Sequence, residues 1–414
     1  MNGRKLVEVI RNYNKIKKEV ISMQVKNLLK GRWIAHSFIV GALVLLLLFA
    51  FLPGCAPEVI PPAEDAYEKY VASLPEGCFP VPRECFEQAI EEGELHFYNW
   101  AEWWPEELFE NFYEEFGIKV TVDGFADVDE MLAKFKLNPK TEYDVVIPNI
   151  RPLVTLIELG ALQRINHDWV PNVNKYLPEA TKEAWYDPGY QYSASWSICC
   201  PVYGYNTKYV DDPRLPSWSV LYEPDEKYKG RITVVNDMYE AIGAALIYLG
   251  YSYNSDDEEE LMEAKELMLR QKPYVMAYDA WPYRAVMEEE AWITQQWHGD
   301  MWFMHRDLQS LMPAYSPEGG GIGCDQMVIP IAAKNPAAAH LFINYIYRPR
   351  VFAQLIERVG HSPNHTAAAQ YLSEELREWQ PPQEYIDRCE YITAKAYTGK
   401  GLELRAAIWE ELKR

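Results

Sequence analysis

The motifs of several common enzyme classes are missing from this chain of 414 residues. It contains no Walker-type glycine loop, which excludes a P-loop nucleotide hydrolase. It contains no Gly-X-Ser-X-Gly segment and no Cys-X-X-Cys pair, so it shows neither a nucleophile elbow nor a thioredoxin-like redox motif. The eight His residues show no metal-ligand spacing. We therefore expect no metal, no cofactor and no enzymatic activity.

Basic residues are in the minority, and many of them lie near the N-terminus. Lys and Arg number 40 against 61 Asp and Glu, and the net charge is −21. Residues 1–54 are net basic, so the remainder is more acidic than the total suggests. Such a body repels phosphates, so we expect no nucleic-acid partner, and it attracts cations. The alternative is that this charge serves solubility alone.

Aromatic residues are abundant, with 14 Trp and 29 Tyr. Such an excess suits a carbohydrate or cation site, because ring faces attract cations. The alternative is a Tyr-rich core and surface. The length of the chain suits about two domains.

Long apolar runs are scarce, and the one present predicts an export signal. Phe38–Leu52 is apolar, follows a basic stretch, and is short for a membrane span. The next segment, Leu52-Pro53-Gly54-Cys55, resembles the lipobox of bacterial lipoproteins. The resemblance implies cleavage before Cys55 and lipid attachment to its thiol, which anchors an extracytoplasmic body to a membrane. An uncleaved anchor is the alternative, and Met23 is an alternative start of a shorter leader.

Residues 55–90 are expected to form a tether. The segment begins Pro-rich, which favours an extended chain. Cys78 and Cys85 flank a short Pro-containing loop, and an exported protein permits a local disulfide between them.

From Glu94 onward, strand and helix patterns alternate. Single helices between strands predict sheets with parallel strands and helices on both faces. Ligands of such sheets bind at the carboxyl ends of the strands. The predicted strands are 95–98, 118–122, 143–148, 231–235, 292–296 and 326–331. The predicted helices are 106–116, 131–136, 238–249, 256–268, 336–347 and 351–359.

Residues 94–410 resemble the bacterial periplasmic spermidine/putrescine-binding proteins of ABC importers. The motifs that carry the resemblance are FYNWAEW at 97–103, YDVVIP at 143–148, the glycines 319–321 leading to Asp325 and Ile329-Pro330, NYIYRP at 344–349, and VGHSPN at 359–364.

The resemblance implies an α/β fold with two lobes, each a mostly parallel sheet flanked by helices, joined by two hinge crossovers. Lobe one is expected at 91–203 plus 325–374, and lobe two at 204–324 plus 375–414. The implied function is capture of a polyamine by a monomer that delivers it to the permease subunits of an ABC importer.

The resemblance also assigns site residues. Glu102 pairs with one terminal ammonium, Asp237 with an inner one, and Glu240 with Asp325 holds the other end. Trp100 and Trp297 wall the aliphatic chain. Trp103, Asn149 and His361 stand at further ligand positions, where relatives often have Tyr, Ser and Tyr. Buried ammonium groups need such partners. The alternatives are a helix cap for Asp237, solvated acids or turn residues for the other carboxylates, and a core position for Trp297.

Five positions depart from the family pattern, and Asn149 and His361 are two of them. Arg151 falls where an aromatic contacts the ligand, Gly323 where a second Trp would lie, and Ile392 at a polar contact. A guanidinium repels a polycation unless it pairs with an acid. The alternative ligands are therefore a shorter amine or a molecule with one cationic and one polar or anionic end. A receptor for another solute, such as an iron complex, an organic cation or a small peptide, is a separate alternative. An enzyme on the same fold and a structural lipoprotein are functions of a different class that the sequence also leaves open.

The crossovers are expected just after Cys200 and at Cys324, so we expect Cys324 to lie near Cys199 or Cys200. A disulfide from Cys324 to one of that pair would brace the hinge. Buried thiols that pack as small apolar side chains are the alternative.

Overall fold

The computed structural model describes residues 65–414 except 102, 126–127, 394–395 and 397. The expected signal peptide (1–54), Cys55, the start of the tether and Glu102 lie outside the described residues. Residues 65–414 form one compact unit. Within the described residues, no helix has the length and apolar character needed to cross a membrane.

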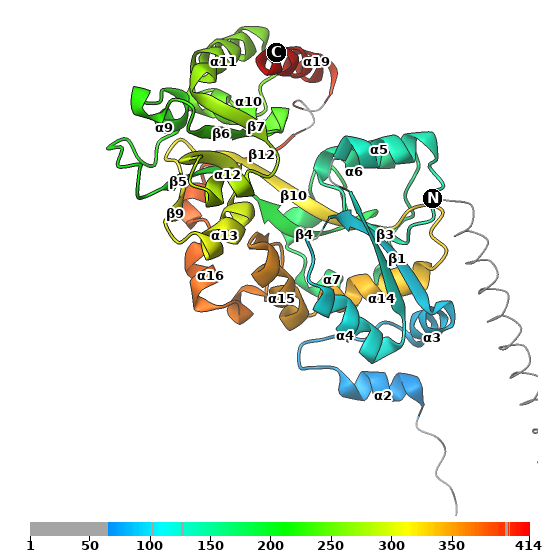
Figure 1. The fold of residues 1–414 in the computed structure, drawn as a ribbon. Helices are drawn as coiled ribbons and strands as arrows, with labels where there is room; N and C mark the ends of the chain where they lie inside the picture. Colours follow the sequence, from blue (N-terminus) through cyan, green and yellow to red (C-terminus); the bar gives the residue numbers. More distant parts are fainter. Residues whose placement is uncertain (1–64, 102, 126–127, 394–395, 397) are drawn as a thin grey trace, which may run out of the picture. The chain divides into compact units, whose positions relative to one another are not determined.

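Two mixed β-sheets organise this unit (Figure 1). The first has the strand order β11-β4-β10-β3-β1-β2, with β12 paired to β10. Its strands are β1 (Glu94–Trp100), β2 (Lys119–Phe125), β3 (Val145–Val146), β4 (Ser193–Cys199), β10 (Gly321–Val328), β11 (Ser362–Pro363) and β12 (Glu390–Tyr391). The second has the order β7-β6-β8-β5-β9. Its strands are β5 (Pro201–Asn206), β6 (Ile232–Val235), β7 (Val275–Asp279), β8 (Ile293–Trp297) and β9 (Leu311–Ala314).

The parallel strands lie where the sequence pattern predicts them, and the crossover strands make each sheet mixed. In the first sheet β1 pairs in parallel with β2 and β3, while β10 is antiparallel to β3 and β4. In the second sheet β6 is parallel to β7 and β8, while β5 is antiparallel to β8 and β9. The chain passes between the sheets at Cys200, and again between β9 and β10. The fold is therefore the expected two-lobed α/β architecture.

Helices cover both faces of the first sheet. On one face the core includes side chains of α3 (Arg83–Glu92), α4 (Glu106–Phe116), α14 (Pro336–Ile346) and α15 (Pro349–Val359). On the other face it includes those of α5 (Val128–Leu137) and α6 (Ile150–Glu158). Strand β1 shows why, because Phe97 belongs to the first cluster and its neighbour Tyr98 to the second, as strand alternation requires.

The second sheet packs against α10 (Met238–Tyr248), and α11 (Glu258–Gln271) and α19 (Gly399–Lys413) lie against α10. The remaining helices are α2 (Ala66–Ser73), α7 (Pro171–Tyr176), α8 (Glu179–Lys182), α9 (Ser219–Tyr222), α12 (Tyr283–Met287), α13 (His298–Asp307), α16 (Glu374–Trp379) and α17 (Gln383–Ile386). Single 3-10 turns lie at His167–Trp169, Glu226–Tyr228, Lys272–Tyr274 and Ala369–Tyr371.

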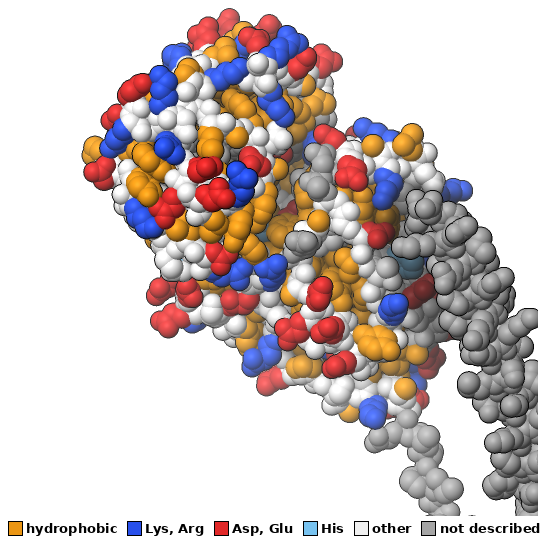
Figure 2. All heavy atoms as spheres, viewed as in Figure 1, with side chains coloured by type: hydrophobic (Ala, Val, Ile, Leu, Met, Phe, Trp, Pro, Cys, Tyr) orange, Lys and Arg blue, Asp and Glu red, His pale blue; other side chains and the backbone are white. Residues whose placement is uncertain are grey.

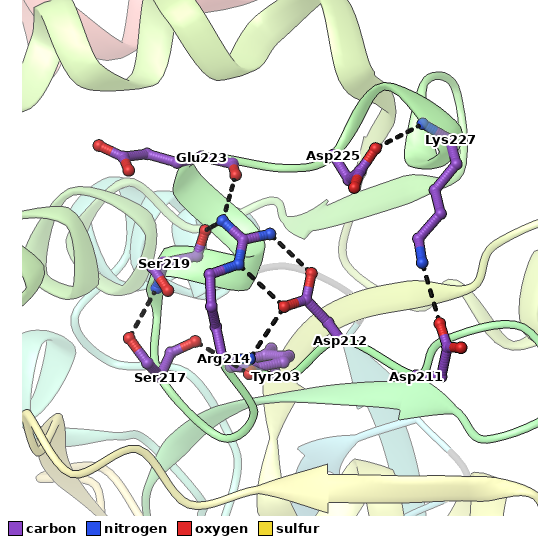
Figure 3. A network of polar contacts seen from close by, with 9 residues as sticks. All are labelled: Tyr203, Asp211, Asp212, Arg214, Ser217, Ser219, Glu223, Asp225 and Lys227. Atoms are coloured by element: carbon purple, nitrogen blue, oxygen red, sulfur yellow. Dashed lines mark hydrogen bonds and ion pairs between the residues drawn. The ribbon is translucent and has the colours of Figure 1, made fainter.

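A polar network fixes the segment between β5 and α9 (Figure 3). The Arg214 guanidinium donates to both carboxylate oxygens of Asp212, at 2.9 and 2.6 Å, and to the carbonyl of Glu223 at 2.7 Å. Arg214 therefore stabilises the conformation of this segment.

Acidic side chains are spread widely over the face shown in Figure 2, in keeping with the acidic composition.

The second half of the expected tether is part of the folded body. Tyr70 on α2 and Phe86 on α3 are buried and stack with ring centroids 4.9 Å apart. Cys85 is fully buried, and its thiol donates to the carbonyl of Ala337 at 3.8 Å. The described residues of the 55–90 segment therefore pack on the core, because α3 buries an apolar face against α14.

The expected disulfides are not formed, and all six described cysteines are free thiols. Cys85 is buried in the core, where its thiol donates to the Ala337 carbonyl, and it forms no bridge to Cys78. Cys324 is buried in the cluster with Tyr186, whereas the Cys199 thiol donates to Asp325 at 3.1 Å. Cys200 makes a thiol hydrogen bond with Cys389. Cys324 does lie near Cys199, because β10 pairs with β4 and sets Gly323 opposite Cys199. The expected bridge is wrong, since Cys324 lies opposite Ile198 and strand alternation sends its side chain to the other face of the sheet from Cys199.

Candidate functional site

Two carboxylates begin helix α10, directly after strand β6. The Asp237 carboxylate caps the helix, accepting from the backbone N–H of Tyr239 at 2.8 Å and of Glu240 at 3.2 Å. Burial raises its pKa, and the positive charge of Arg151 acts against that rise. Asp237 is therefore a helix cap, as the alternative interpretation expected. Both capping bonds use Oδ1, so Oδ2 takes no part in the cap.

Glu240 is 6% exposed and lies one turn along the same helix. It accepts a short hydrogen bond from the Tyr253 hydroxyl and one from the Trp297 indole N–H at 3.2 Å. Burial, followed by the nearby charge of Asp237, raises the pKa of Glu240 to about 7. The structure thus brings together three predicted site residues: Asp237, Glu240 and Trp297.

Trp297 ends strand β8 and precedes helix α13, whose first turn carries Asp300. Burial, together with the negative charge of Asp325, raises the pKa of Asp300 to about 7. Sequence reasoning missed Asp300. An available signal was its position in the first helical turn after a strand that ends in a predicted ligand Trp, since strand ends form ligand sites in α/β folds.

Asp325 lies on β10, at the centre of the first sheet, and is 4% exposed. Its Oδ2 accepts from the Ser197 hydroxyl at 2.8 Å and from the Cys199 thiol at 3.1 Å. Burial raises its pKa to about 6. Asn149 forms an isolated β-bridge with Asp325, and its side-chain oxygen is buried without a hydrogen bond from any described residue. The turn alternative for Asp325 is wrong, because this acid is in a strand.

An aromatic group lies next to Asp325. The Trp103 ring makes edge contacts with Trp196 and with His361, each with centroids 5.3 Å apart. Trp100 packs against Trp103 and against Phe125. His361 is 2% exposed, and burial lowers its pKa, so the imidazole is neutral at pH 7. Trp100, Trp103, Asn149, Asp325 and His361 thus form the second group of predicted residues.

The departures from the family pattern have structural explanations. Arg151 donates to Asp129 at 2.9 Å and lies 5.6 Å from the centre of the Tyr239 ring, so its charge has an acidic partner. A Cβ added at Gly323 would lie 3.6 Å from the terminal methyl of Ile392. Ile392 is buried, so it occupies space beside Gly323 where a second Trp was expected.

The two groups of residues come from different sheets and influence each other. Asp237 and Glu240 follow β6 of the second sheet, whereas Asp325 lies in the first. The charges of Asp300 and Asp325 interact, as do those of Asp237 and Arg151. A two-lobed α/β fold with acidic and aromatic side chains from both lobes defines the class of solute-binding receptors.

The family follows from comparison with known proteins. Residues 107–381 match the family model of bacterial extracellular solute-binding proteins. The chain belongs to this family.

Individual relatives are consistent with the expected subgroup. The spermidine/putrescine-binding periplasmic protein of Salmonella typhimurium is 31% identical over 283 residues, which cover 68% of this chain and 80% of that protein. The putrescine/cadaverine-binding protein of Pseudomonas aeruginosa is 29% identical over 304 residues, which cover 70% and 84%. The substrate-binding protein of a spermidine/putrescine ABC transporter from Streptococcus pneumoniae superposes with a TM-score of 0.69 at 25% identity, covering 77% of this chain and 98% of that one.

Proposed function

We propose that this chain is the solute-binding component of an ABC importer and that it captures a polyamine such as spermidine or putrescine. One observation carries the proposal. Desolvation raises the pKa values of the Glu240, Asp300 and Asp325 carboxyl groups, and none of them forms an ion pair with a Lys or Arg of the described residues; the charge of Arg405 opposes the rise at Glu240 alone. A cationic ligand supplies the missing counter-charge.

A polyamine also fits the remaining surfaces. Its ammonium groups are separated by methylene chains, which need apolar walls. Trp297 and Trp103 provide such walls, and indole faces attract cations as well. The names of the relatives in Salmonella and Pseudomonas support the same ligand class. Binding and release, without chemical conversion, is the activity that this arrangement serves.

Calorimetry with a ligand panel tests the proposal. We expect spermidine, putrescine or cadaverine to bind with a Kd in the micromolar range or below, in a 1:1 ratio. The matched control is 1,4-butanediol, which keeps the length of putrescine and replaces both ammonium groups by hydroxyls. Equal affinity for the diol, or no heat with any amine, would contradict the proposal.

We further propose that the protein is an extracytoplasmic lipoprotein, attached through Cys55, that acts as a monomer on the permease subunits. The apolar run 38–52 and the Leu52–Cys55 segment support this location. Lobe one would comprise 91–203 plus 325–374, and lobe two 204–324 plus 375–414. Strand β5 already brings Pro201 into the second sheet, whereas β10 from Gly321 and β12 belong to the first sheet.

Changing Cys55 tests the anchor. We expect Cys55→Ser to abolish lipid labelling and to shift the protein from the membrane fraction to the soluble fraction, or to leave it unprocessed. Persistent lipid labelling of this variant would show that the lipid is attached elsewhere.

A further inference from the structure

Three side chains beside the proposed amine site have the chemistry of a transition-metal site. Cys199, Asp325 and His361 each place one ligand atom within 4.8 Å of the ligand atoms of the other two. They come from three strands or strand ends, namely β4, β10 and the residue before β11. Because these three residues are far apart in the sequence, no short spacing motif predicts the site.

The geometry is close to that of a tetrahedral metal. With metal–sulfur and metal–oxygen bonds of about 2.3 and 2.1 Å, tetrahedral ligands lie roughly 3.6 Å apart. The Cys199 sulfur and the Asp325 Oδ2 are 3.1 Å apart, so a small shift is sufficient. The Ser197 hydroxyl donates to the same carboxylate at 2.8 Å and holds it in place, as outer hydrogen bonds do in metal sites.

His361 provides the independent observation. Its Nδ1 is fully buried and makes no hydrogen bond with a described residue. The neighbouring His298 differs. Its Nδ1 accepts from the backbone N–H of Cys200 at 3.3 Å, and its Nε2 contacts the Ser362 hydroxyl at 3.3 Å. The His361 imidazole therefore has a buried nitrogen without a partner, and one of its two ring nitrogens lies within 4.8 Å of the ligand atoms of Cys199 and Asp325.

The ring is also fitted closely to its position. A Cβ added at Gly299 would lie 2.7 Å from the His361 Nδ1, so only glycine at that position admits the imidazole. The Trp103 ring makes an edge contact with the same imidazole.

We propose that Cys199, Asp325 and His361 bind a divalent transition-metal ion, with Zn²⁺ as the representative. A thiolate and an imidazole select such ions over Ca²⁺ and Mg²⁺, which take oxygen ligands. Three protein ligands leave a fourth position open to a solute donor. The proposal does not depend on polyamine binding, but the two ligands share Asp325, so they compete.

The experiment is calorimetry with ZnCl₂ on the whole protein without its signal peptide, reduced and treated with a chelator beforehand. Absorption spectroscopy with Co²⁺ complements it. We expect 1:1 binding and a sulfur-to-cobalt charge-transfer band. Cys199→Ser abolishes the band, and Cys199→Ser and His361→Gln each weaken Zn²⁺ binding at least about tenfold. The matched control Cys324→Ser removes the adjacent buried thiol and leaves both signals unchanged.

The outcomes separate this proposal from the amine proposal. Saturating Zn²⁺ should weaken polyamine binding at least about tenfold, as expected for a shared ligand. Absence of the thiolate band in the wild-type protein, or Zn²⁺ affinity unchanged in both ligand variants, overturns the metal site while leaving amine binding intact. Tight Zn²⁺ binding with no amine binding overturns the amine proposal alone.

Discussion

Asp237 combines a structural role with a proposed ligand contact, so its substitution has to separate the two. Asn caps helices about as well as Asp. We therefore expect Asp237→Asn to retain stability and to lose on the order of 3 kcal/mol of polyamine binding, the scale for removing one partner of a buried charge pair. Calorimetry measures the loss.

Asp257 offers a matched control. It caps α11 in the same way, accepting from the backbone N–H groups of Glu259 and Glu260, but is exposed. Asp257→Asn should leave polyamine affinity unchanged. If Asp237→Asn also binds with wild-type affinity, Asp237 is only a cap.

The buried carboxylate of Glu240 is expected to lower the free energy of unfolding of the ligand-free protein. Its pKa is raised from 4.5 to about 7 in the folded protein. Between these values the unfolded chain has lost the proton and the folded one retains it. Stability from this group is therefore present below about pH 4.5 and is lost as the pH rises through 7. We expect Glu240→Gln to raise the free energy of unfolding by about 1–3 kcal/mol at pH 8 without ligand, and by little at pH 4.

Denaturant unfolding at the two pH values measures this effect. Glu263 is the control, because it accepts a hydrogen bond from the Tyr251 hydroxyl at 2.8 Å but is exposed. Glu263→Gln should change stability by less than about 0.5 kcal/mol at both pH values. A Glu240→Gln variant that is destabilised at pH 8 would show that its hydrogen bonds outweigh its desolvation.

The junction of β8 and α13 is the element on which the aromatic wall depends. Trp297 ends the strand, donates to Glu240, and precedes the turn that holds Asp300. We expect Trp297→Ala to cost about 2 kcal/mol or more of polyamine binding, as for a buried aromatic anchor.

Trp292 provides the comparison for that element. It precedes β8 at the opposite end and stacks on Tyr209 with centroids 4.7 Å apart. Trp292→Ala should alter stability and leave the Kd for polyamine unchanged. If both substitutions changed the Kd equally, Trp297 would be a core residue that makes no contact with the ligand.

Periodicity in the sequence predicts most elements closely. Helix 106–116 matches α4, and 238–249 exceeds α10 by one residue, because apolar spacing and flanking Gly residues mark them. Strand 326–331 begins too late, since β10 starts at Gly321. A Cβ there would lie 2.5 Å from the Tyr253 ring, so this glycine serves close packing inside a strand rather than a turn.

The site was predicted less completely than the fold. The resemblance named Asp237, Glu240, Trp297 and Asp325. The structure places Asp237 and Trp297 at strand ends. It places Glu240 in the first turn of α10 and Asp325 in β10. Asp300 was missed because segments far away in the sequence bury its carboxyl group. Residue spacing along one helix does not reveal such burial. The helices before residue 93 were missed because Pro residues dominate the start of that segment, whereas burial of Phe86 depends on α14.

At the scale of the whole molecule, the divided site predicts closure. Asp325 belongs to the first sheet, and Asp237 with Glu240 to the second, so one ligand that contacts both favours the closed arrangement. We expect the radius of gyration from solution scattering to decrease at saturating polyamine. The Asp237→Asn variant should show no decrease at the same ligand concentration. An unchanged radius in the fully saturated wild-type protein would contradict closure.

The most direct test of polyamine capture between the two sheets is a crystal structure of the polyamine-saturated protein. We predict an elongated ligand between the sheets, with one ammonium within hydrogen-bonding distance of Asp237 or Glu240. A second ammonium should contact Asp325 or Asp300, and the methylene chain should lie along Trp297. A polyamine bound elsewhere, or held without any of these four carboxylates, would contradict the central claim.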